Sequence, residues 1–350
     1  MNTRPEDRRD GTLTSQSAGT QSSETQSPET QSPATEDLRT GNLRTRNLRT
    51  ENLRTENLRT LEPENPTREL GNPRTQPGNP RTREPENSVF AHRGGAKLRP
   101  ENTIVAFDHG LSLGADGLEL DVHLSRDGIV VVHHDALLDR TTSGRGPLAT
   151  LRAAELASLD AAKLWPEFAG RGVGIPTLRE VLARYPGIPL IIELKVNTEQ
   201  MARCTIDEVR AAEAIERVSL GSFGTRVLRA ARTCEPAIAT GSSREETRLA
   251  LYRSWIRWPV RSPAYRAYQV PEFAGSTRVV SPRFIRDAHA AGCVVQVWTV
   301  DEESDMLRLL DWGVDGIISD RPDLAVRVVR EKRGQPPFFA KKGDNRQIGT

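Results

Sequence analysis

The sequence predicts an α/β protein folded as a (β/α)₈ barrel, the TIM-barrel architecture, with a small insertion after its second strand. Two observations lead to this prediction. From Ser88 onwards, short apolar runs alternate with stretches of helical pattern, and strands alternating with helices indicate parallel βα units. About eight such units follow one another within residues 87–330, a length close to the roughly 250 residues of a typical barrel.

The predicted strands are the runs dominated by apolar residues. In chain order they are VFAH (89–92), GLELDVHL (117–124), IVVVHH (129–134), PLIIELKV (189–196), VSLGSF (218–223), AIAT (237–240), YQVP (268–271), VVQVWTV (294–300) and GIIS (316–319). Helical pattern lies between most of them, as at 102–113, 281–291 and 302–311. The segment 135–176 is rich in Gly, Pro and Thr and is predicted to be the insertion, whereas 197–217 looks short for a full helix with its loops.

Both ends of the chain are predicted to be disordered. Residues 1–86 contain no Val, Ile, Phe, Trp, Tyr or Cys, so this stretch cannot bury enough apolar surface to offset the entropy of ordering it. Part of it repeats NLRT with a five-residue period, which places the leucines on no single face of a helix or a strand. The segment 331–350 is predicted to be a disordered tail, and no partner is indicated for the N-terminal extension.

Composition limits the class of protein. The formal net charge of +2 gives no reason to expect a nucleic-acid partner. Three widely spaced cysteines, Cys204, Cys234 and Cys293, are predicted to be buried thiols in a reducing compartment. The first residues lack the apolar core of a secretion signal, and no run approaches the roughly 18 apolar residues of a membrane span. We therefore expect a cytoplasmic protein without stable membrane insertion.

Acidic residues recur on two of the predicted strands. Glu119 and Asp121 are two apart and so share one face of their strand, and Glu193 and Lys195 repeat this spacing. Charges on the inward face of a barrel strand are costly unless paired or metal-bound, and the C-terminal strand ends are where barrel enzymes place their chemistry. Three carboxylates meeting there would raise one another's pKa unless a cation neutralised them. Their oxygens favour Mg²⁺ or Ca²⁺ over Zn²⁺, although either pair alone is also compatible with a solvated rim.

Two histidines follow apolar runs and are candidates for proton transfer. His92 ends the first predicted strand and is followed by Arg93 and two glycines, and His134 ends another and is followed by Asp135. An imidazole with a pKa near neutrality can take a proton from a nucleophile or give one to a leaving alkoxide. Arg93 could bind phosphate oxygens through its guanidinium, while the glycines would let the backbone approach closely. A structural role for each histidine and an exposed position for the arginine are the alternatives.

Ten short blocks occur in order along residues 88–325. They are HRG (92–94), PENT (100–103), Ala106-Phe107, GADGLELDVHLSRDG (114–128), HDALLDRTTSGRG (134–146), IPTL (175–178), IELK (192–195), SF (222–223), VWTV (297–300) and GVDGIISDRPD (313–323). This ordered set resembles the glycerophosphodiester phosphodiesterase family. The resemblance implies a (β/α)₈ barrel with a small insertion after the second strand, and a phosphoric diester hydrolase.

The resemblance also implies a role for each site residue. The roles are His92 and His134 as the acid/base pair, Glu119, Asp121 and Glu193 as ligands of one divalent metal ion, Arg93 and Lys195 as phosphate-side cations, Glu101 as a supporting residue, and Trp298 and Gln269 as pocket residues. The implied cofactor is Mg²⁺ or Ca²⁺, and the implied substrate is a small glycerophosphodiester. Its products would be sn-glycerol 3-phosphate and an alcohol. Direct attack by water and attack by a neighbouring substrate hydroxyl both remain open, as does the choice of which histidine is the base.

Four further histidines are not assigned to the site. His123 shares the strand parity of Asp121, but at about 3.3 Å per residue it would lie some 7 Å beyond it, and the family pattern has no ligand there. His133 neighbours His134 but faces the opposite side of its strand. His109 and His289 lie on predicted helices and are expected to be surface or packing residues.

Two aspartates near the end of the chain are interpreted as helix caps. Asp320 precedes Arg321-Pro322, and Asp301 follows the VWTV block, where the family often has Asn. Short polar side chains at such positions commonly accept a hydrogen bond from the first turn of a helix. Neither aspartate is therefore given a role in the site.

Two other functions fit the same sequence. A lysophospholipase D of the same architecture would need an apolar trough or membrane-facing patch, which Trp255, Trp258 and Tyr265 with their flanking arginines could supply. A non-catalytic binding scaffold would use the repeat extension to recruit partners. The scaffold is disfavoured because every expected catalytic position is filled.

Overall fold

The computed structural model describes residues 87–336, and eight parallel strands form a barrel within this range. They are β1 (Ser88–His92), β2 (Gly117–Leu124), β4 (Leu190–Leu194), β5 (Val218–Gly221), β6 (Ala239–Thr240), β7 (Ala267–Pro271), β10 (Val294–Trp298) and β11 (Gly316–Ser319). They pair in the order β6-β5-β4-β2-β1-β11-β10-β7. The two ends of this order meet through a parallel bridge between Gly241 and Ala267. The prediction of a (β/α)₈ barrel is confirmed.

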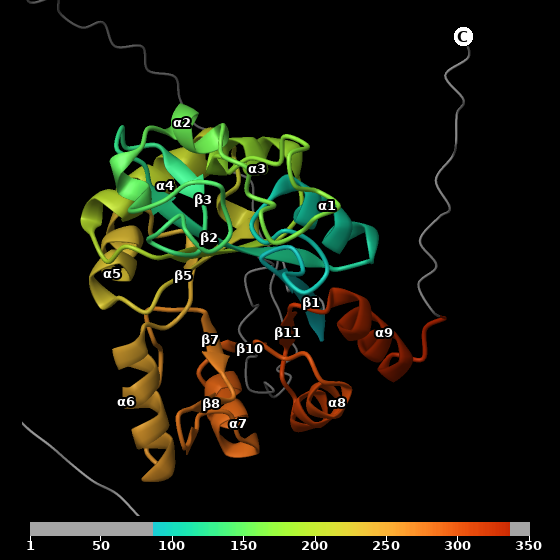
Figure 1. The fold of residues 1–350 in the computed structure, drawn as a ribbon. Helices are drawn as coiled ribbons and strands as arrows, with labels where there is room; N and C mark the ends of the chain where they lie inside the picture. Colours follow the sequence, from blue (N-terminus) through green and yellow to red (C-terminus); the bar gives the residue numbers. More distant parts are fainter. Residues whose placement is uncertain (1–86, 337–350) are drawn as a thin grey trace, which may run out of the picture. The chain divides into compact units, whose positions relative to one another are not determined.

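A helix follows each barrel strand and lies on the outside of the sheet (Figure 1). In order these are α1 (Ile104–Ser112), α3 (Leu178–Arg184), α4 (Glu199–Ala211), α5 (Thr225–Cys234), α6 (Arg244–Trp255), α7 (Pro282–Ala290), α8 (Glu303–Trp312) and α9 (Pro322–Lys332). Alternation along the strands explains the packing. On β2, Leu118, Leu120 and Val122 are fully buried in the main apolar core, which leaves Glu119 and Asp121 on the inward face.

The insertion begins earlier than predicted. The run 129–134 contains β3 (Val130–Val132), which pairs antiparallel with β2 and lies off the barrel. With the 3₁₀ helix η1 (Leu148–Thr150) and α2 (Ala153–Ala157), β3 belongs to the excursion between β2 and α3. This excursion has its own apolar core, made by Val131, Leu138, Leu148, Leu156, Ala161 and Ile175. A continuous apolar run does not distinguish a parallel from an antiparallel strand, which is why the sequence pattern placed the boundary too late.

The expectation that 197–217 is too short for a full helix was wrong. Helix α4 has 13 residues, and the 3₁₀ helix η2 (Ile215–Arg217) completes the segment before β5. Thr198 begins α4 because its side chain accepts a hydrogen bond from the Met201 amide. The buried side includes Met201 and Ile206. Very short connections on both sides of α4 make room for these three and a half turns.

Smaller features complete the described chain. After β7, a hairpin of β8 (Phe273–Ala274) and β9 (Thr277–Arg278) precedes α7. The three cysteines are free, as predicted, but Cys293 alone is buried, and Cys204 and Cys234 are partly exposed.

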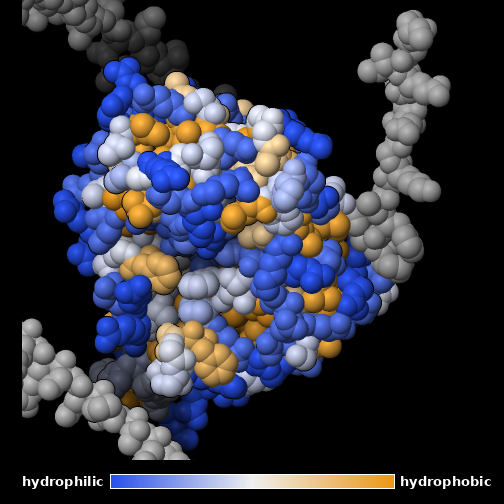
Figure 2. Space-filling model, viewed as in Figure 1, coloured by the Kyte–Doolittle hydropathy of each residue, from blue (hydrophilic) through white to orange (hydrophobic). Residues whose placement is uncertain are grey.

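Hydrophilic residues cover most of the face seen in Figure 2, with hydrophobic residues in small groups between them. Among residues 87–336, no helix has the length and apolar character needed to cross a bilayer. The predicted extension 1–86 lies outside the described residues, as does most of the predicted tail 331–350.

Candidate active site

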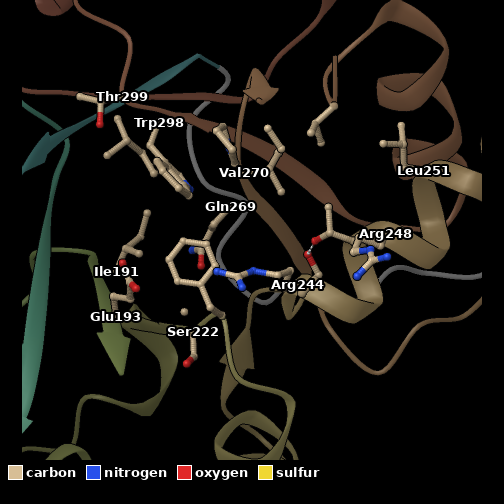
Figure 3. A pocket seen from close by; sticks show the side chains of 18 of the residues that line it. Ile191, Glu193, Ser222, Arg244, Arg248, Leu251, Gln269, Val270, Trp298 and Thr299 are labelled. Carbon is tan, nitrogen blue, oxygen red and sulfur yellow. Dashed lines mark hydrogen bonds between the residues drawn. The ribbon is translucent and has the colours of Figure 1, made fainter. Parts of the chain in front are cut away.

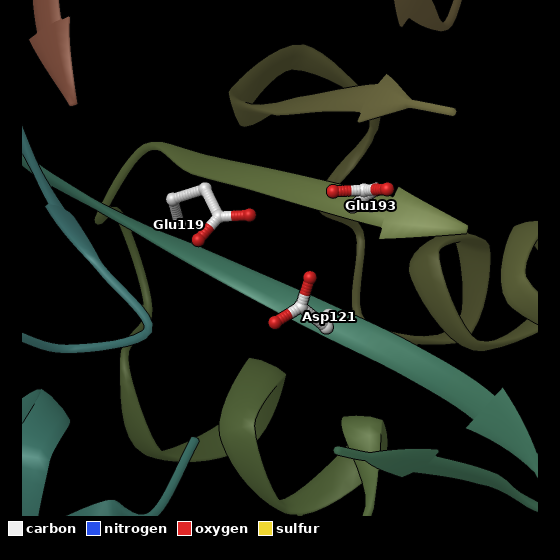
Figure 4. Close-up of side chains that lie close together, drawn as sticks. All are labelled: Glu119, Asp121 and Glu193. Carbon is white, nitrogen blue, oxygen red and sulfur yellow. The ribbon is translucent and has the colours of Figure 1, made fainter. Parts of the chain in front are cut away.

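Strand register brings three carboxylates together inside the barrel (Figure 4). Glu119 and Asp121 share the inward face of β2, and Asp121 lies opposite Glu193 of β4 in the parallel pairing. One carboxylate oxygen from each residue lies within 4.8 Å of the others. The structure therefore unites the three residues that the sequence analysis named as metal ligands.

The carboxylates of this cluster differ in their electrostatics. Burial, and then the neighbouring charge of Asp121, raise the pKa of Glu119 to about 7. Burial alone would also raise the pKa of Asp121, but the charges of Lys195 and Arg93 lower it below its usual value. Lys195 Nζ lies 2.9 Å from Asp121 Oδ1 and 3.1 Å from Glu193 Oε2. Three carboxyl groups therefore lie beside two basic side chains, Lys195 and Arg93.

The donor set fits a hard divalent cation. Every candidate ligand atom is a carboxylate oxygen, as Mg²⁺ and Ca²⁺ prefer. Asn102 holds the other oxygen of Asp121, since its Nδ2 donates to Asp121 Oδ2 at 2.8 Å. Asp121 Oδ1 is buried and receives no hydrogen bond of good geometry, although Lys195 is close. A buried carboxylate oxygen that receives no hydrogen bond is suited to coordinate a metal ion.

His92 lies beside this cluster at the end of β1. The pairing of β1 with β2 places His92 opposite Glu119, and His92 Nε2 lies 3.7 Å from Glu119 Oε2. Its other ring nitrogen, Nδ1, lies 2.6 Å from Asp320 Oδ1. Burial alone would lower the pKa of His92, but the charge of Glu119 and the hydrogen bond to Asp320 raise it above the ordinary value. An imidazole oriented in this way can exchange a proton through Nε2.

The prediction that Asp320 and Asp301 cap helices was wrong. Helix α9 begins after Arg321 without a side-chain cap, and Asp320 instead contacts His92. Asp301 Oδ1 accepts hydrogen bonds from the Asp320 amide at 2.8 Å and from the Ser319 hydroxyl at 2.9 Å. Asp301 therefore supports the loop that carries Asp320. Both residues follow barrel strands, so their side chains bond across the end of the barrel instead of to the next helix.

His134 is held by a second carboxylate. It lies two residues beyond the end of β3, and its Nδ1 is 2.6 Å from Asp135 Oδ1. Arg140 donates to Asp135 at 2.6 Å and to both oxygens of Glu101, at 2.9 and 2.7 Å. Burial alone would raise the pKa of the Asp135 carboxyl, but hydrogen bonds from Arg140 and His134 hold it well below its usual value. Asp135 therefore stays ionised and fixes the ring of His134.

Arg93 lies between the acidic cluster and Glu101. Its Nη1 donates to Glu101 at 3.0 Å, and its Nε lies 3.2 Å from Asp121 Oδ2. The backbone turns sharply here, with φ of 50° at Arg93 and 84° at Gly94. A Cβ on Gly94 would lie 2.7 Å from Ala106, so this position requires glycine. Glu101, predicted as a supporting residue, lies between Arg93 and Arg140 and accepts hydrogen bonds from both.

These groups open into one cavity of about 1020 Å³. His92, His134, Glu119, Glu193 and Lys195 line one part of it. Trp298 and Gln269, the two predicted pocket residues, also line it, and Figure 3 shows the side chains of Trp298 and Arg244 both extending towards Gln269. Trp298 meets the ring of Phe223 edge to face, with centroids 5.8 Å apart, and the Arg244 guanidinium lies 4.8 Å from the centre of the same ring.

Comparison with known proteins identifies the family. Residues 92–324 match the model of the glycerophosphoryl diester phosphodiesterase family. The chain belongs to this family. A glycerophosphodiester phosphodiesterase of Caldanaerobacter subterraneus is 34% identical over 250 residues, which cover 69% of this chain and 98% of that protein.

Two further relatives bear on what such a site binds. A phosphodiesterase of Oleispira antarctica, solved in complex with the product sn-glycerol-3-phosphate, aligns with a TM-score of 0.57 and 28% identity over 70% of this chain and 97% of that one. A lysophospholipase D of Mus musculus is 27% identical, over 66% of this chain and 82% of that protein. As a member of the family, the chain is a phosphodiester hydrolase.

The histidines that were set aside lie outside the carboxylate cluster. His123 is buried, and its Nε2 lies 3.1 Å from the His134 carbonyl oxygen. His133 Nε2 lies 3.4 Å from the carbonyl of Leu137. His289 pairs with Asp315 on the outside of the barrel, and His109 lies in the last turn of α1.

Three site residues were missed in the sequence. Asn102, Asp135 and Arg140 all lie inside the quoted PENT and HDALLDR blocks, but none received a role. Asn102 has φ of 58° and is buried, which lets its side chain bond both the carboxylate and the amide of Asp121. The sequence signal that could have pointed to these three residues was their position inside blocks shared with the family.

Tyr265 does not belong to the predicted aromatic patch. It is 4% exposed, and its hydroxyl lies 2.7 Å from that of Tyr268. Trp255 and Trp258 are exposed, as that prediction requires.

Proposed function

We propose that this chain hydrolyses glycerophosphodiesters to sn-glycerol 3-phosphate and an alcohol, with one divalent cation and two histidines as acid and base. One arrangement carries the proposal. The cavity is lined by Glu119 and Glu193 of a cation-ready carboxylate cluster, together with two imidazoles, each fixed by its own aspartate. A phosphodiester resists attack because its anionic oxygens repel nucleophiles, so neutralisation and proton transfer are the two things that a catalyst must supply.

The negative charge of the phosphate would be neutralised by basic side chains and by the cation that the acidic cluster would hold. Arg93 and Lys195 line the cavity beside the carboxylates and would bind the phosphate oxygens. Glu119, Asp121 and Glu193 would hold the cation, Mg²⁺ or Ca²⁺. When bound, such an ion neutralises phosphate charge as it redistributes in the transition state.

Proton transfer falls to His92 and His134. Each uses Nδ1 to contact an aspartate, so each has Nε2 available for the reaction. One imidazole takes the proton of the attacking hydroxyl group while the oxygen of that group forms a bond to phosphorus. The other gives a proton to the alkoxide oxygen as the phosphorus–oxygen bond to the alcohol breaks. Each such group is typically worth about 10²- to 10⁴-fold in rate.

A polar group further out suits a substrate hydroxyl. Gln269 donates through Nε2 to Gln296 at 3.0 Å, whereas its buried Oε1 has no hydrogen-bond partner. Gly221 and Gly241 lie against this oxygen, and a Cβ on Gly241 would lie 2.6 Å from it. We infer that the Gln269 side chain, which lines the cavity, turns its amide to bring Oε1 to a substrate hydroxyl. The Oleispira relative, which was solved with sn-glycerol-3-phosphate, supports that product.

A lysophospholipid is the second candidate substrate, and the size of the cavity favours it. About 1020 Å³ is more than a glycerol phosphate with a small headgroup needs. Beyond Trp298 and Phe223, the cavity continues between α6 and the β8–β9 hairpin along largely apolar side chains. These include Leu249, Leu251, Tyr252, Trp255, Ala274 and Val279. An acyl chain would fit this arm, and the mouse relative is named a lysophospholipase D.

A product screen with added metals tests both candidates. The full chain is incubated with glycerophosphocholine, glycerophosphoethanolamine or lysophosphatidylcholine in Mg²⁺, Ca²⁺ or excess EDTA. Release of sn-glycerol 3-phosphate from the first two, abolished by EDTA and restored by metal, is the expected result. Lysophosphatidic acid as the sole product would establish the second candidate instead. Full turnover in EDTA would contradict the metal site, and no turnover of any diester would contradict the proposed function.

A further inference from the structure

Helix α6 carries large apolar side chains on its exposed side. Its buried side consists of Ala250, Leu251 and Ser254, whereas the exposed side and the turn after the helix carry residues that we call the α6 patch. These are Leu249 (53% exposed), Tyr252 (58%), Trp255 (57%), Ile256 (51%) and Trp258 (68%). The solvent side of a surface helix is ordinarily polar. A contiguous exposed group of this kind marks a binding surface.

The same segment is strongly basic. Between residues 244 and 261 the chain has five arginines and two glutamates. The Glu245 carboxylate accepts a hydrogen bond from Thr225, and Glu246 pairs with Arg232 at 2.7 Å. Within residues 87–336, no carboxylate lies within ion-pair distance of Arg248, Arg257 or Arg261. With five arginines against two glutamates, the segment that carries the α6 patch has a formal net charge of +3.

A local contact presents Trp258 to solvent. The Arg253 guanidinium lies 5.0 Å from the centre of the Trp258 ring, and Arg253 Nε donates to the Trp258 carbonyl at 2.9 Å. Arg257, with φ of 59°, lies in the turn after α6. The indole is therefore fixed on one side by an arginine and remains two-thirds exposed.

We propose that the α6 patch docks on the surface of an anionic phospholipid membrane. Trp and Tyr combine an apolar ring with a polar edge and favour the headgroup level of a bilayer, while arginines beside them attract anionic lipids. Leu249 and Ile256 would enter the acyl region. These two aliphatic side chains offer no stacking surface for bases, which disfavours a single-stranded nucleic acid as the occupant.

Docking would bring the cavity to the bilayer. Leu249, Tyr252 and Trp255 belong to the α6 patch and also line the outer part of the cavity. In Figure 1, α6 lies at the edge of the barrel beside β8 and α7. Membrane docking is separable from hydrolysis, because vesicle binding requires no turnover and a chain inactive on every diester could still bind.

Vesicle flotation of the full chain tests the docking surface. Phosphatidylcholine vesicles with and without phosphatidylglycerol are compared for wild type, the double variant Ile256→Ser/Trp258→Ser and the double variant Arg257→Gln/Arg261→Gln. None of these four residues lines the cavity. The matched control is Arg171→Gln/Arg203→Gln, which removes two exposed arginines elsewhere. Circular dichroism confirms that each variant is folded.

Wild type is expected to float with the anionic vesicles alone. Loss of two arginines should weaken binding roughly 25-fold, about fivefold for each charge near the surface. Loss of the two apolar side chains should weaken it roughly tenfold or more. Raised salt should release the chain, and the control should bind as wild type does.

Several results would overturn the proposal. Absence of binding, equal binding to both vesicle types, or equal loss in the control would each do so. Wild type that dimerises through the α6 patch and ignores vesicles would assign the patch to self-association. Binding to an RNA oligonucleotide without vesicle binding would assign it to nucleic acid.

Discussion

His92 Nδ1 and Asp320 Oδ1 lie 2.6 Å apart, although 228 residues separate them in the chain. The contact exists because β1 pairs in parallel with β11, so the ends of the first and last barrel strands are neighbours. The Asp320 amide in turn donates a hydrogen bond to Asp301 Oδ1 at 2.8 Å. The imidazole proposed for proton transfer is thus oriented by the closure of the barrel itself.

Removing the charge of Asp320 should impair turnover. In Asp320→Asn the amide no longer selects the imidazole tautomer that leaves Nε2 available, so kcat should fall by about 10²-fold or more. Initial rates of glycerophosphodiester hydrolysis measure this. Asp323→Asn is the matched control, because Asp323 lies nearby in the first turn of α9 and pairs with Arg321 instead of His92. Equal rates in both variants would remove Asp320 from the mechanism.

Arg140 should contribute to turnover although it does not itself contact His134. It holds Asp135 and Glu101 together, so Arg140→Gln should let the pKa of Asp135 rise towards its ordinary value and should loosen His134. We expect a fall in kcat of roughly tenfold or more and a shift of the acid limb of the pH–rate profile. Arg145→Gln, an exposed neighbour on the same insertion, should behave as wild type. An unchanged profile in Arg140→Gln would show that the network does not position His134.

A partly buried ion pair makes a prediction for stability. Arg232 contacts Glu246 at 2.7 and 3.1 Å, and the Ser243 amide also donates to Glu246. Burial alone would raise the pKa of Glu246, but the hydrogen bond from Arg232 lowers it below its usual value. Its ionised form therefore stabilises the fold above the unfolded-state pKa, and this contribution is lost as pH falls through the folded-state pKa.

Glu246→Gln should accordingly lower the free energy of unfolding by about 1 to 3 kcal/mol near neutral pH. The difference from wild type should be smaller at about pH 3, below the ordinary pKa of a glutamate, because the stability from the ionised carboxylate is lost as Glu246 takes up a proton. Urea unfolding at the two pH values measures it. Glu303→Gln breaks an exposed pair with Arg327 and should cost little at either pH. A difference that grows in acid would contradict the sign of this linkage.

Sequence patterns correctly predicted the features that follow from the periodicity of a single strand, such as which residues face the inside of the barrel. The spacing of Glu119 and Asp121 on an apolar strand places both on the inward face, and the same parity applies to Glu193. Contacts between distant segments were not predictable in this way. Asp320 has the local context of a helix cap, and only strand pairing shows that it lies beside His92. The antiparallel direction of β3 was hidden for a similar reason, since its apolar run fits either orientation.

His123 offers a control for the metal site. It shares strand parity with Glu119 and Asp121, yet it lies outside the carboxylate cluster and contacts the His134 backbone. His123→Gln should retain the affinity for divalent cations that wild type has. Glu119→Gln removes one ligand and should weaken that affinity by at least about tenfold. Circular dichroism of both variants confirms that any difference reflects the site and not the fold.

Calorimetric titration of the metal-free chain with Mg²⁺ or Ca²⁺ tests the carboxylate cluster most directly. Wild type and His123→Gln should each bind one cation with similar affinity, while Glu119→Gln should bind weakly or not at all. Hydrolysis should rise in parallel with occupancy of that site. Binding that survives in Glu119→Gln and is lost in His123→Gln, or full hydrolysis without any bound cation, would contradict the site built on Glu119, Asp121 and Glu193.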